Sequence, residues 1–139
     1  MEPRISIITL GVSDLGRSHR FYVELGLPTS GQPSDGIVFF ETSGTRLALF
    51  PLEALATDAG MRVGSRGFPG ITLAHNVRRR AEVDEVLAAA VRAGGTLVDP
   101  AHERDWGGYS GYVLDPDGYP WEIAWADSWE FNEDGSLVV

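Results

Sequence analysis

The sequence predicts an α+β fold made of two βαβββ modules, whose curved mixed sheets enclose a concave pocket. Two observations carry this prediction. A β-branched run followed by an amphipathic helix occurs twice, beginning near residues 5 and 71. In each half a glycine turn, at Gly44 or at Gly118, then separates two apolar runs. Each half is too small to bury its own sheet, so we expect the two sheets to face each other.

The first half opens with residues 5–12, whose β-branched character predicts a buried strand. Ser13 and Asp14 then supply N-cap chemistry for a helix, apolar residues recur at helical spacing as far as about Glu24, and Gly26 ends the helix. The turn residues predict a hairpin of strands 37–42 and 45–50, followed by a short helix within 51–60. We expect four strands in this half, as in the second.

The second half repeats this order. Residues 71–77 predict a strand and residues 81–93 an alanine-rich helix, which two glycines end before a strand that begins at 96. The turn sequence Asp-Pro-Asp-Gly at 115–118 joins the last two strands, 109–114 and 121–125. We expect one domain over residues 1–139, divided into module 1 (about 5–60), a linker (61–69), module 2 (about 70–126) and an acidic, polar tail (127–139).

Composition excludes several classes of function. The 139 residues carry 11 basic and 20 acidic side chains, a net charge of −9, and no cysteine. The lack of cysteine excludes thiol nucleophiles, iron–sulfur clusters and disulfides. An acidic chain is a poor match for phosphates, so we expect no nucleic-acid partner. No apolar run reaches the roughly 20 residues that span a bilayer, and the start lacks a signal-peptide layout. We expect a cytoplasmic protein of bacterial type with a small-molecule partner and no membrane partner.

Two stretches resemble the vicinal oxygen chelate superfamily, which comprises glyoxalase I, bleomycin-resistance proteins and extradiol dioxygenases. Residues 7–27 are similar to the family's opening strand and helix, and residues 115–123, DPDGYPWEI, to its closing hairpin. The resemblance implies the paired-module fold and a homodimer. It also implies a divalent metal, held by one residue near the start of each module's first strand and one in each module's last strand.

By the resemblance, these four ligand positions fall on Ile7 (or Ile8), Ala48, Thr72 and Glu122. The family's ligands are mostly His or Glu, and only Glu122 is of that type. Isoleucine and alanine offer no lone pair, and threonine is a poor neutral ligand for zinc, nickel or iron. We therefore expect no metal ion and no other cofactor.

None of the three histidines matches a ligand position. His75 shares the parity of Ile71 and Leu73 in its strand, so period-two alternation directs it towards the helix. His19 lies on the first helix among Arg and Ser residues, which is typical of a solvated surface. His102 lies in a predicted loop at a strand end, where it either reaches a pocket mouth or stays in solvent.

The same alternation predicts the residues that line the pocket. They are Ile7, Thr9, Gly11, Arg46, Ala48, Phe50, Thr72, Ala74, Asn76, Glu122 and Ala124. This lining is mostly small or apolar, as ligand cavities usually are. Its two charges, Arg46 and Glu122, either pair with each other or hold opposite ends of a ligand.

Residues 106–112, Trp-Gly-Gly-Tyr-Ser-Gly-Tyr, interleave large aromatic side chains with glycines. One interpretation is a pocket wall or lid in which Trp106, Tyr109 and Tyr112 stack on an aromatic or cationic ligand. The other is a bulged edge strand whose aromatics fill the core or a dimer interface. In the tail, Trp129 and Phe131 are costly to expose, so we expect them to fold back over the domain or onto a partner subunit.

Two functions fit these observations. The first is a metal-independent protein of the bleomycin-resistance kind that binds a small aromatic or cationic ligand, which the acidic charge attracts. Glu122 is then a ligand anchor or, as a catalytic residue, a general base that acts without metal. The alternative is a lyase, isomerase or dioxygenase with a non-standard divalent-metal site that includes Glu122, for instance together with His102.

Overall fold

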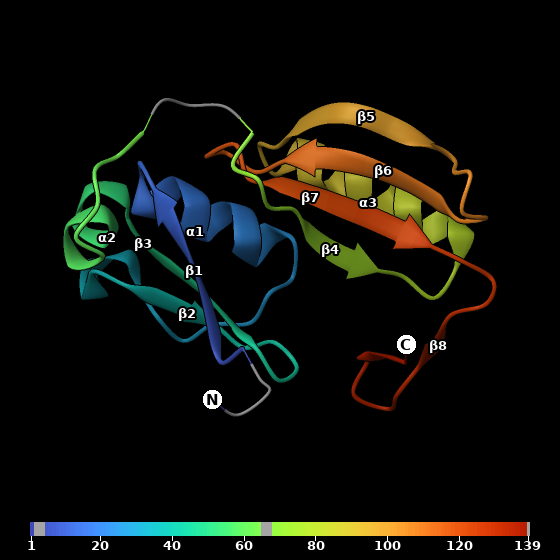
Figure 1. The fold of residues 1–139 in the computed structure, drawn as a ribbon, viewed down its shortest axis with the longest axis horizontal. Helices are drawn as coiled ribbons and strands as arrows, with labels where there is room; N and C mark the ends of the chain where they lie inside the picture. Colours follow the sequence, from blue (N-terminus) through green and yellow to red (C-terminus); the bar gives the residue numbers. More distant parts are fainter. Residues whose placement is uncertain (2–4, 65–67, 139) are drawn as a thin grey trace. The chain divides into compact units, whose positions relative to one another are not determined.

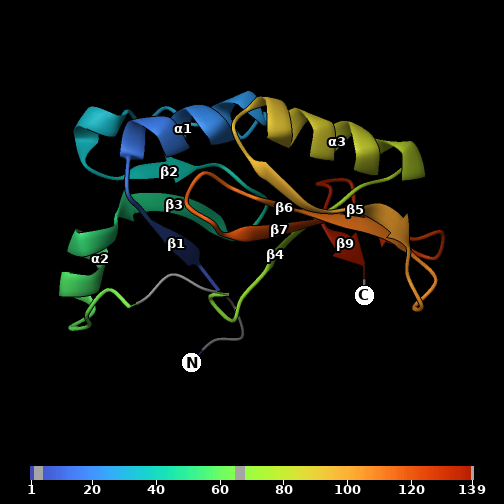
Figure 2. The ribbon, with the colours of Figure 1, turned by 90° about the horizontal axis from the view of Figure 1, so that it is seen from above.

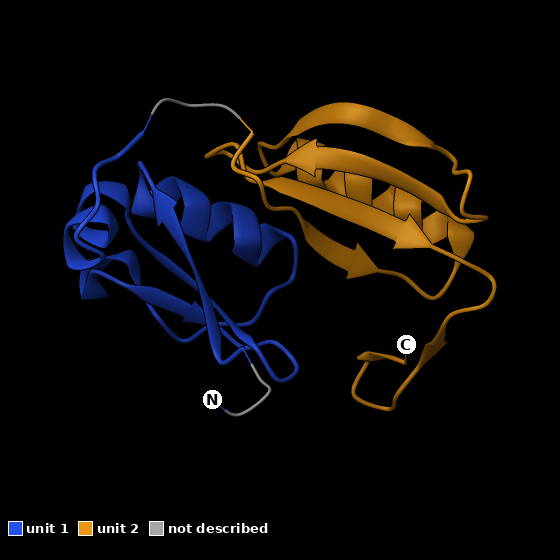
Figure 3. Ribbon diagram, in the orientation of Figure 1, with its two compact units in different colours: residues 1–67 blue, residues 68–139 orange. Residues whose placement is uncertain are grey.

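The chain folds into two units, residues 1–67 and 68–139; the first combines a sheet with helices, and the second combines a sheet with a helix (Figures 1 and 3). The boundary falls inside the linker predicted at 61–69. The computed structural model describes residues 1, 5–64 and 68–138, so the part of the linker at 65–67 lies outside the described residues. Both units combine helical structure with a mixed sheet, which confirms the predicted α+β class.

The first unit has a three-stranded sheet in the order β1-β3-β2. Its elements in chain order are β1 (Ile7–Val12), α1 (Leu15–Glu24), a 3₁₀ turn (Pro33–Asp35), β2 (Val38–Phe40), β3 (Arg46–Pro51) and α2 (Leu52–Asp58). Strand β3 lies parallel to β1 and antiparallel to β2. Asp14 caps α1 as predicted, because its Oδ1 accepts a hydrogen bond from the backbone N–H of Arg17 at 2.9 Å.

The expectation of four strands in this half is wrong, since its described residues form three. The segment between α1 and β2 contains Pro28 and Pro33 and closes its 3₁₀ turn on Gly36, whose φ is +82°. Proline removes a ladder donor, and a left-handed glycine ends an extended run. A 3₁₀ turn therefore stands where the fourth strand was expected.

The two faces of the first sheet are covered differently. Leu10, Val12, Phe40 and Leu49 are buried on the face that packs against Phe21 and Tyr22 of α1. Helix α2 lies on the other face, because a Cβ added to Gly11 would stand 2.7 Å from Leu52 Cδ1. Glycine at this position thus permits the close approach of α2 to β1.

The second unit has a four-stranded sheet in the order β4-β7-β6-β5. Its elements are β4 (Leu73–Asn76), α3 (Arg80–Arg92), β5 (Thr96–Glu103), β6 (Tyr109–Leu114) and β7 (Pro120–Trp125). Strand β4 lies parallel to β7, and the other neighbours are antiparallel. Figure 2 shows α3 along one face of this sheet, where Val83, Leu87 and Ala90 are buried.

The tail is also ordered within the second unit. It forms a small hairpin of β8 (Glu130–Phe131) and β9 (Leu137–Val138), which the sequence reading did not predict. As expected, its aromatics fold back: the ring of Trp129 stacks on Trp106 with centroids 5.7 Å apart, and the Arg78 guanidinium lies 4.8 Å from the ring centre of Phe131. In the described part of the chain, no helix has the length and apolar character needed to cross a membrane.

Candidate functional site

The side chains of strand β6 show which residues lie on each face of the second sheet. A Cβ added to Gly111 would stand 2.7 Å from Leu87 Cδ1, so Gly111 faces α3. Because side chains alternate along a strand, Tyr109 and Val113 share that face, whereas Ser110 and Tyr112 point to the opposite one. Ser110 and Tyr112 therefore place polar groups on the face opposite α3.

Strand pairing extends this face across the sheet in two rows, since paired residues point to the same side. One row runs Asp99, Tyr112, Glu122, Ala74, and the next runs His102, Ser110, Ala124, Asn76. We use the name polar cluster for Asp99, His102, Arg104, Ser110, Tyr112 and Glu122.

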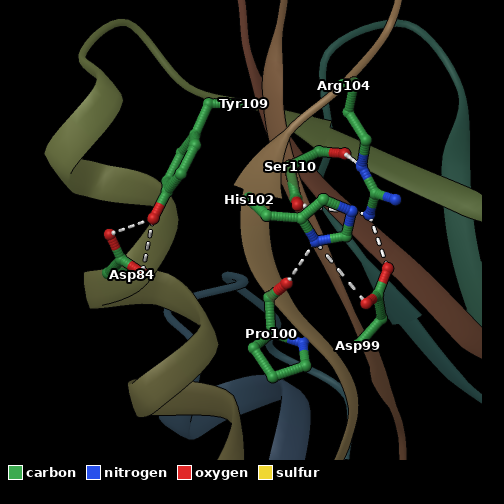
Figure 4. Close-up of polar contacts among 7 residues, drawn as sticks. All are labelled: Asp84, Asp99, Pro100, His102, Arg104, Tyr109 and Ser110. Carbon is green, nitrogen blue, oxygen red and sulfur yellow. Dashed lines mark hydrogen bonds and ion pairs between the residues drawn. The ribbon is translucent and has the colours of Figure 1, made fainter.

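Arg104 connects Asp99 and Ser110 of the cluster, as Figure 4 shows. Its Nε donates to Ser110 Oγ at 2.8 Å, and its Nη2 donates to Asp99 Oδ2 at 2.6 Å and to the Ser110 carbonyl at 3.2 Å. The guanidinium lies 5.6 Å from the ring centre of Tyr112. Such charge-assisted contacts are stronger than neutral hydrogen bonds, so Arg104 is held in one orientation.

Tyr112 and Glu122 form the second pair of the cluster. They are directly opposite each other on β6 and β7. Desolvation raises the pKa of the Tyr112 phenol, and the negative charge of Glu122 raises it further. The two side chains are therefore close enough to interact electrostatically.

His102 lies at the edge of the cluster and is not brought next to Glu122. The expectation of a loop position is wrong, because His102 belongs to β5 and pairs with Ser110 of β6. Its Nδ1 lies 2.9 Å from the Pro100 carbonyl oxygen and 3.7 Å from Asp99 Oδ1. Strand β6 stands between β5 and β7, so His102 and Glu122 are separated by a whole strand.

Two irregularities in β5 explain why sequence reasoning missed Asp99 and Arg104. The register shifts between Leu97 and Asp99 and again between Asp99 and His102. Each shift adds one residue to β5, so Asp99 and His102 share a face although three positions separate them. Ser110 was also missed, yet its parity with Tyr112 along residues 109–114 was a signal that could have found it.

The aromatic segment does not form a single wall, which corrects the first interpretation of it. Tyr109 points towards α3, where its hydroxyl lies 3.2 and 3.3 Å from the carboxylate oxygens of Asp84 (Figure 4). The guanidinium of Arg80 covers its ring at 3.7 Å. Trp106 is stacked on Trp129. Of the three aromatics, Tyr112 lies on the face opposite α3.

In the first unit, the register places the predicted lining residues together on one face. The pairs are Ile7 with Arg46, Thr9 with Ala48, and Gly11 with Phe50. Phe39 pairs with Ala48 and so joins this face, 43% exposed, although sequence reasoning missed it. Val38 and Phe40 are buried in the core, and the residue between two core positions of a strand points the other way.

In the second unit, β4 carries the remaining predicted lining residues. Ala74 pairs with Glu122 and Asn76 with Ala124, whereas Thr72 precedes the strand. His75 pairs with the buried Ile123 and lies on the α3 side, as predicted. Desolvation lowers the pKa of His75, and the nearby Glu82 carboxylate opposes this shift. The neutral form of His75 is therefore favoured.

The donor set does not fit the divalent metal that the resemblance implies. Ile7 and Ala48 of the first unit offer no lone pair, and Thr72 of the second is a weak neutral donor. Of the four positions, only Glu122 carries a side chain of the family's ligand type. Within residues 1, 5–64 and 68–138, no group of three or more His, Cys, Asp or Glu side chains is placed to hold a metal ion.

Comparison with known proteins agrees with this fold. The family model described as Glyoxalase/Bleomycin resistance protein/Dioxygenase superfamily matches residues 4–123. A glyoxalase-related enzyme from Fulvimarina pelagi has a similar structure, with a TM-score of 0.91 and 40% sequence identity over 99% of this chain and 98% of that chain. No protein with a curated description matches.

More distant structures have the same architecture. A lactoylglutathione lyase from Agrobacterium tumefaciens is 26% identical, with a TM-score of 0.70 over 95% of this chain and 100% of that chain. A family enzyme from Burkholderia phytofirmans, 19% identical, has a TM-score of 0.72 over 88% of this chain and 98% of that chain, and so shares the fold. By sequence and by structure, this chain belongs to the glyoxalase/bleomycin resistance protein/dioxygenase superfamily.

Proposed function

We propose that this protein binds a small organic cation with an aromatic part, without a metal ion, and that Glu122 and Tyr112 recognise it. One observation carries the proposal. Glu122, at the position where the resemblance implies a metal ligand, lies directly opposite Tyr112 on the neighbouring strand and on the same face of the sheet. A carboxylate beside a phenol ring offers a negative charge next to a flat surface, which is the chemistry that recognises cationic aromatic groups.

The charges of the polar cluster favour a cation over an anion. Arg104 is paired with Asp99 at 2.6 Å, so these two charges balance each other. Glu122 then leaves the cluster with a net charge of −1 when His102 is neutral. The whole chain, at −9, adds a long-range attraction for positive ligands.

Calorimetry and thermal shift with three matched probes test the proposal: an aryl-alkyl quaternary ammonium, its neutral isostere and its carboxylate analogue. We expect the cation alone to stabilise the protein, by about 2.7 kcal/mol at a hundredfold excess over Kd. Glu122→Gln should weaken binding at least tenfold. Glu103→Gln is the matched control, because Glu103 lies on β5 of the same sheet and pairs with Arg80 of α3. The proposal is contradicted if all three probes bind equally, or if the cation does not bind.

The same measurements are repeated after chelation and after addition of zinc, nickel, manganese or ferrous ions. We expect no change in cation affinity, because the family's ligand positions hold Ile7, Ala48 and Thr72. An affinity that depends on added metal, and is lost in Glu122→Gln, would instead favour the lyase, isomerase or dioxygenase alternative. The homodimer stays a prediction, which light scattering on the purified protein checks.

A further inference from the structure

The polar cluster is connected to the C-terminal tail through the turn that joins β5 to β6. In this turn the backbone N–H of Arg104 donates to the Gly108 carbonyl at 2.8 Å, and that of Gly107 donates to the Arg104 carbonyl at 2.9 Å. The φ of Gly107, +89°, is in the left-handed region, which glycine permits. Arg104 therefore begins the same tight turn that carries Trp106 at its tip.

Trp106 folds back over this turn. A Cβ added to Gly108 would lie 1.7 Å from Cζ3 of the Trp106 ring, so the ring occupies the space that any other residue's side chain would need. The indole is still 53% exposed. A half-exposed ring of this size keeps one position when a second aromatic surface packs against it.

Trp129 supplies that surface. The two indole rings stack with centroids 5.7 Å apart and planes 18° from parallel. The tail around Trp129 is itself anchored, because Arg78 Nη2 donates to the Asn132 carbonyl at 3.2 Å and the Arg78 guanidinium covers Phe131. The backbone N–H of Trp129 also donates to the Ala126 carbonyl at 3.2 Å. The tail thus presents Trp129 as a fixed platform for Trp106.

We infer that Trp129 is a positioning residue for Arg104: its stack on Trp106 fixes the 104–108 turn and thereby the guanidinium on Ser110, Asp99 and Tyr112. The C-terminal hairpin is then part of the recognition apparatus of the polar cluster. When Arg104 is released, Asp99 loses its counter-charge and Tyr112 loses the guanidinium beside its ring. The cluster becomes more negative, so selection between ligands of different positive charge changes; this consequence rests on the proposed function.

The test measures Arg104 itself, without any ligand. In ¹⁵N-edited NMR spectra near pH 6, the Arg104 Nε–H of the wild type should exchange slowly with water, because it donates to Ser110 Oγ at 2.8 Å. We expect exchange to be at least tenfold faster in Trp129→Leu, which lacks the platform. Trp129→Phe keeps a flat ring and should restore most of the protection. Arg80, held by Glu103 and Tyr109 on the opposite face, is the internal control and should not change.

Gly108→Ala tests the inference without altering either tryptophan. Its methyl group meets the far end of the Trp106 ring, which can swing away, so the stack breaks while the turn keeps its backbone. We expect the same loss of Arg104 protection with a melting temperature within a few degrees of the wild type. If Trp129→Leu does not fold, Gly108→Ala tests the inference on its own. Unchanged Arg104 exchange in the folded variants would overturn the inference, whatever the protein binds; failure of cation binding alone would overturn the proposed function.

Discussion

Tyr109 and Tyr112 lie three residues apart on β6 and point to opposite faces of its sheet, Tyr109 to Asp84 of α3 and Tyr112 to Glu122 of β7. Removal of each hydroxyl therefore has a different effect. Tyr112→Phe should weaken cation binding about tenfold, because the site loses the polar hydroxyl beside the Glu122 carboxylate. Titration calorimetry measures this loss.

The matched variant Tyr109→Phe should leave binding unchanged and lower the free energy of unfolding by about 1 kcal/mol or less, since its bond to Asp84 is partly solvated. Equal losses of affinity in both variants would contradict the assignment of the two faces.

Arg104 and Asp99 should stabilise the fold jointly. Arg104→Met removes hydrogen bonds to Asp99 and to Ser110 and should cost about 2 to 3 kcal/mol of unfolding free energy, because one partner, the Ser110 hydroxyl, is fully buried. Arg104→Lys should recover only part of this loss, since an ammonium cannot reproduce the planar fork. Urea unfolding measures both.

A double-mutant cycle with Asp99→Asn isolates the ion pair. Asp99 is 37% exposed, so we expect a coupling of about 1 kcal/mol, well below the full cost of Arg104→Met. Additive losses in the double variant would show that the pair contributes nothing.

Gly111 and Gly16 should respond to alanine in opposite directions. At Gly111 the new Cβ would stand 2.7 Å from Leu87 Cδ1 and 2.8 Å from the backbone at both Asp99 and Ala101, so Gly111→Ala should destabilise the fold by about 1 to 3 kcal/mol. At Gly16 in α1 the nearest atom, Asp14 Oδ1, would be 3.4 Å away, which is an ordinary contact.

Gly16→Ala should therefore stabilise α1 by up to about 1 kcal/mol through its higher helix propensity. Thermal and urea unfolding of the two variants check these signs. A neutral Gly111→Ala would mean that α3 does not pack closely on β6.

His75 should make the protein less stable in mild acid. Its pKa in the folded chain lies below the ordinary value of 6.5, because desolvation outweighs the attraction of Glu82. As the pH falls through 6.5, the unfolded chain therefore takes up a proton that the folded chain does not, and stability decreases. Above that pH His75 takes up no proton in either state, so this loss of stability is absent.

Urea midpoints between pH 5 and 7.5 measure this dependence, and the decrease should be smaller in His75→Gln. An NMR titration in which His75 has a pKa of 6.5 or higher would contradict the prediction.

The sequence predicts the second unit well because specific turn residues mark the ends of its strands. Strand 109–114 is predicted to the residue, and the turn of Asp115 and Gly118 that follows it is present, with Asp115 Oδ1 accepting from the N–H groups of Asp117 and Tyr119. In the first unit, prolines and glycines between α1 and β2 replace an expected strand with a 3₁₀ turn.

The candidate site is predicted only in part. Glu122 and Tyr112 lie on regular strands, where period-two alternation places them. Asp99 and Arg104 lie beyond register shifts that no local pattern signals, and the stack of Trp106 on Trp129 joins residues 23 positions apart. Contacts of this kind depend on tertiary packing, which composition and periodicity do not encode.

The two register shifts in β5 have a consequence for the way this edge strand can vary. Each one absorbs a single added residue, so the side chains that follow it keep their face of the sheet. Deleting Pro100 or Ala101 would remove the second shift and place Asp99 and His102 two positions apart, so His102 would still pair with Ser110 on the face of the polar cluster. One residue can therefore be lost from this edge strand while the same side chains remain beside Arg104.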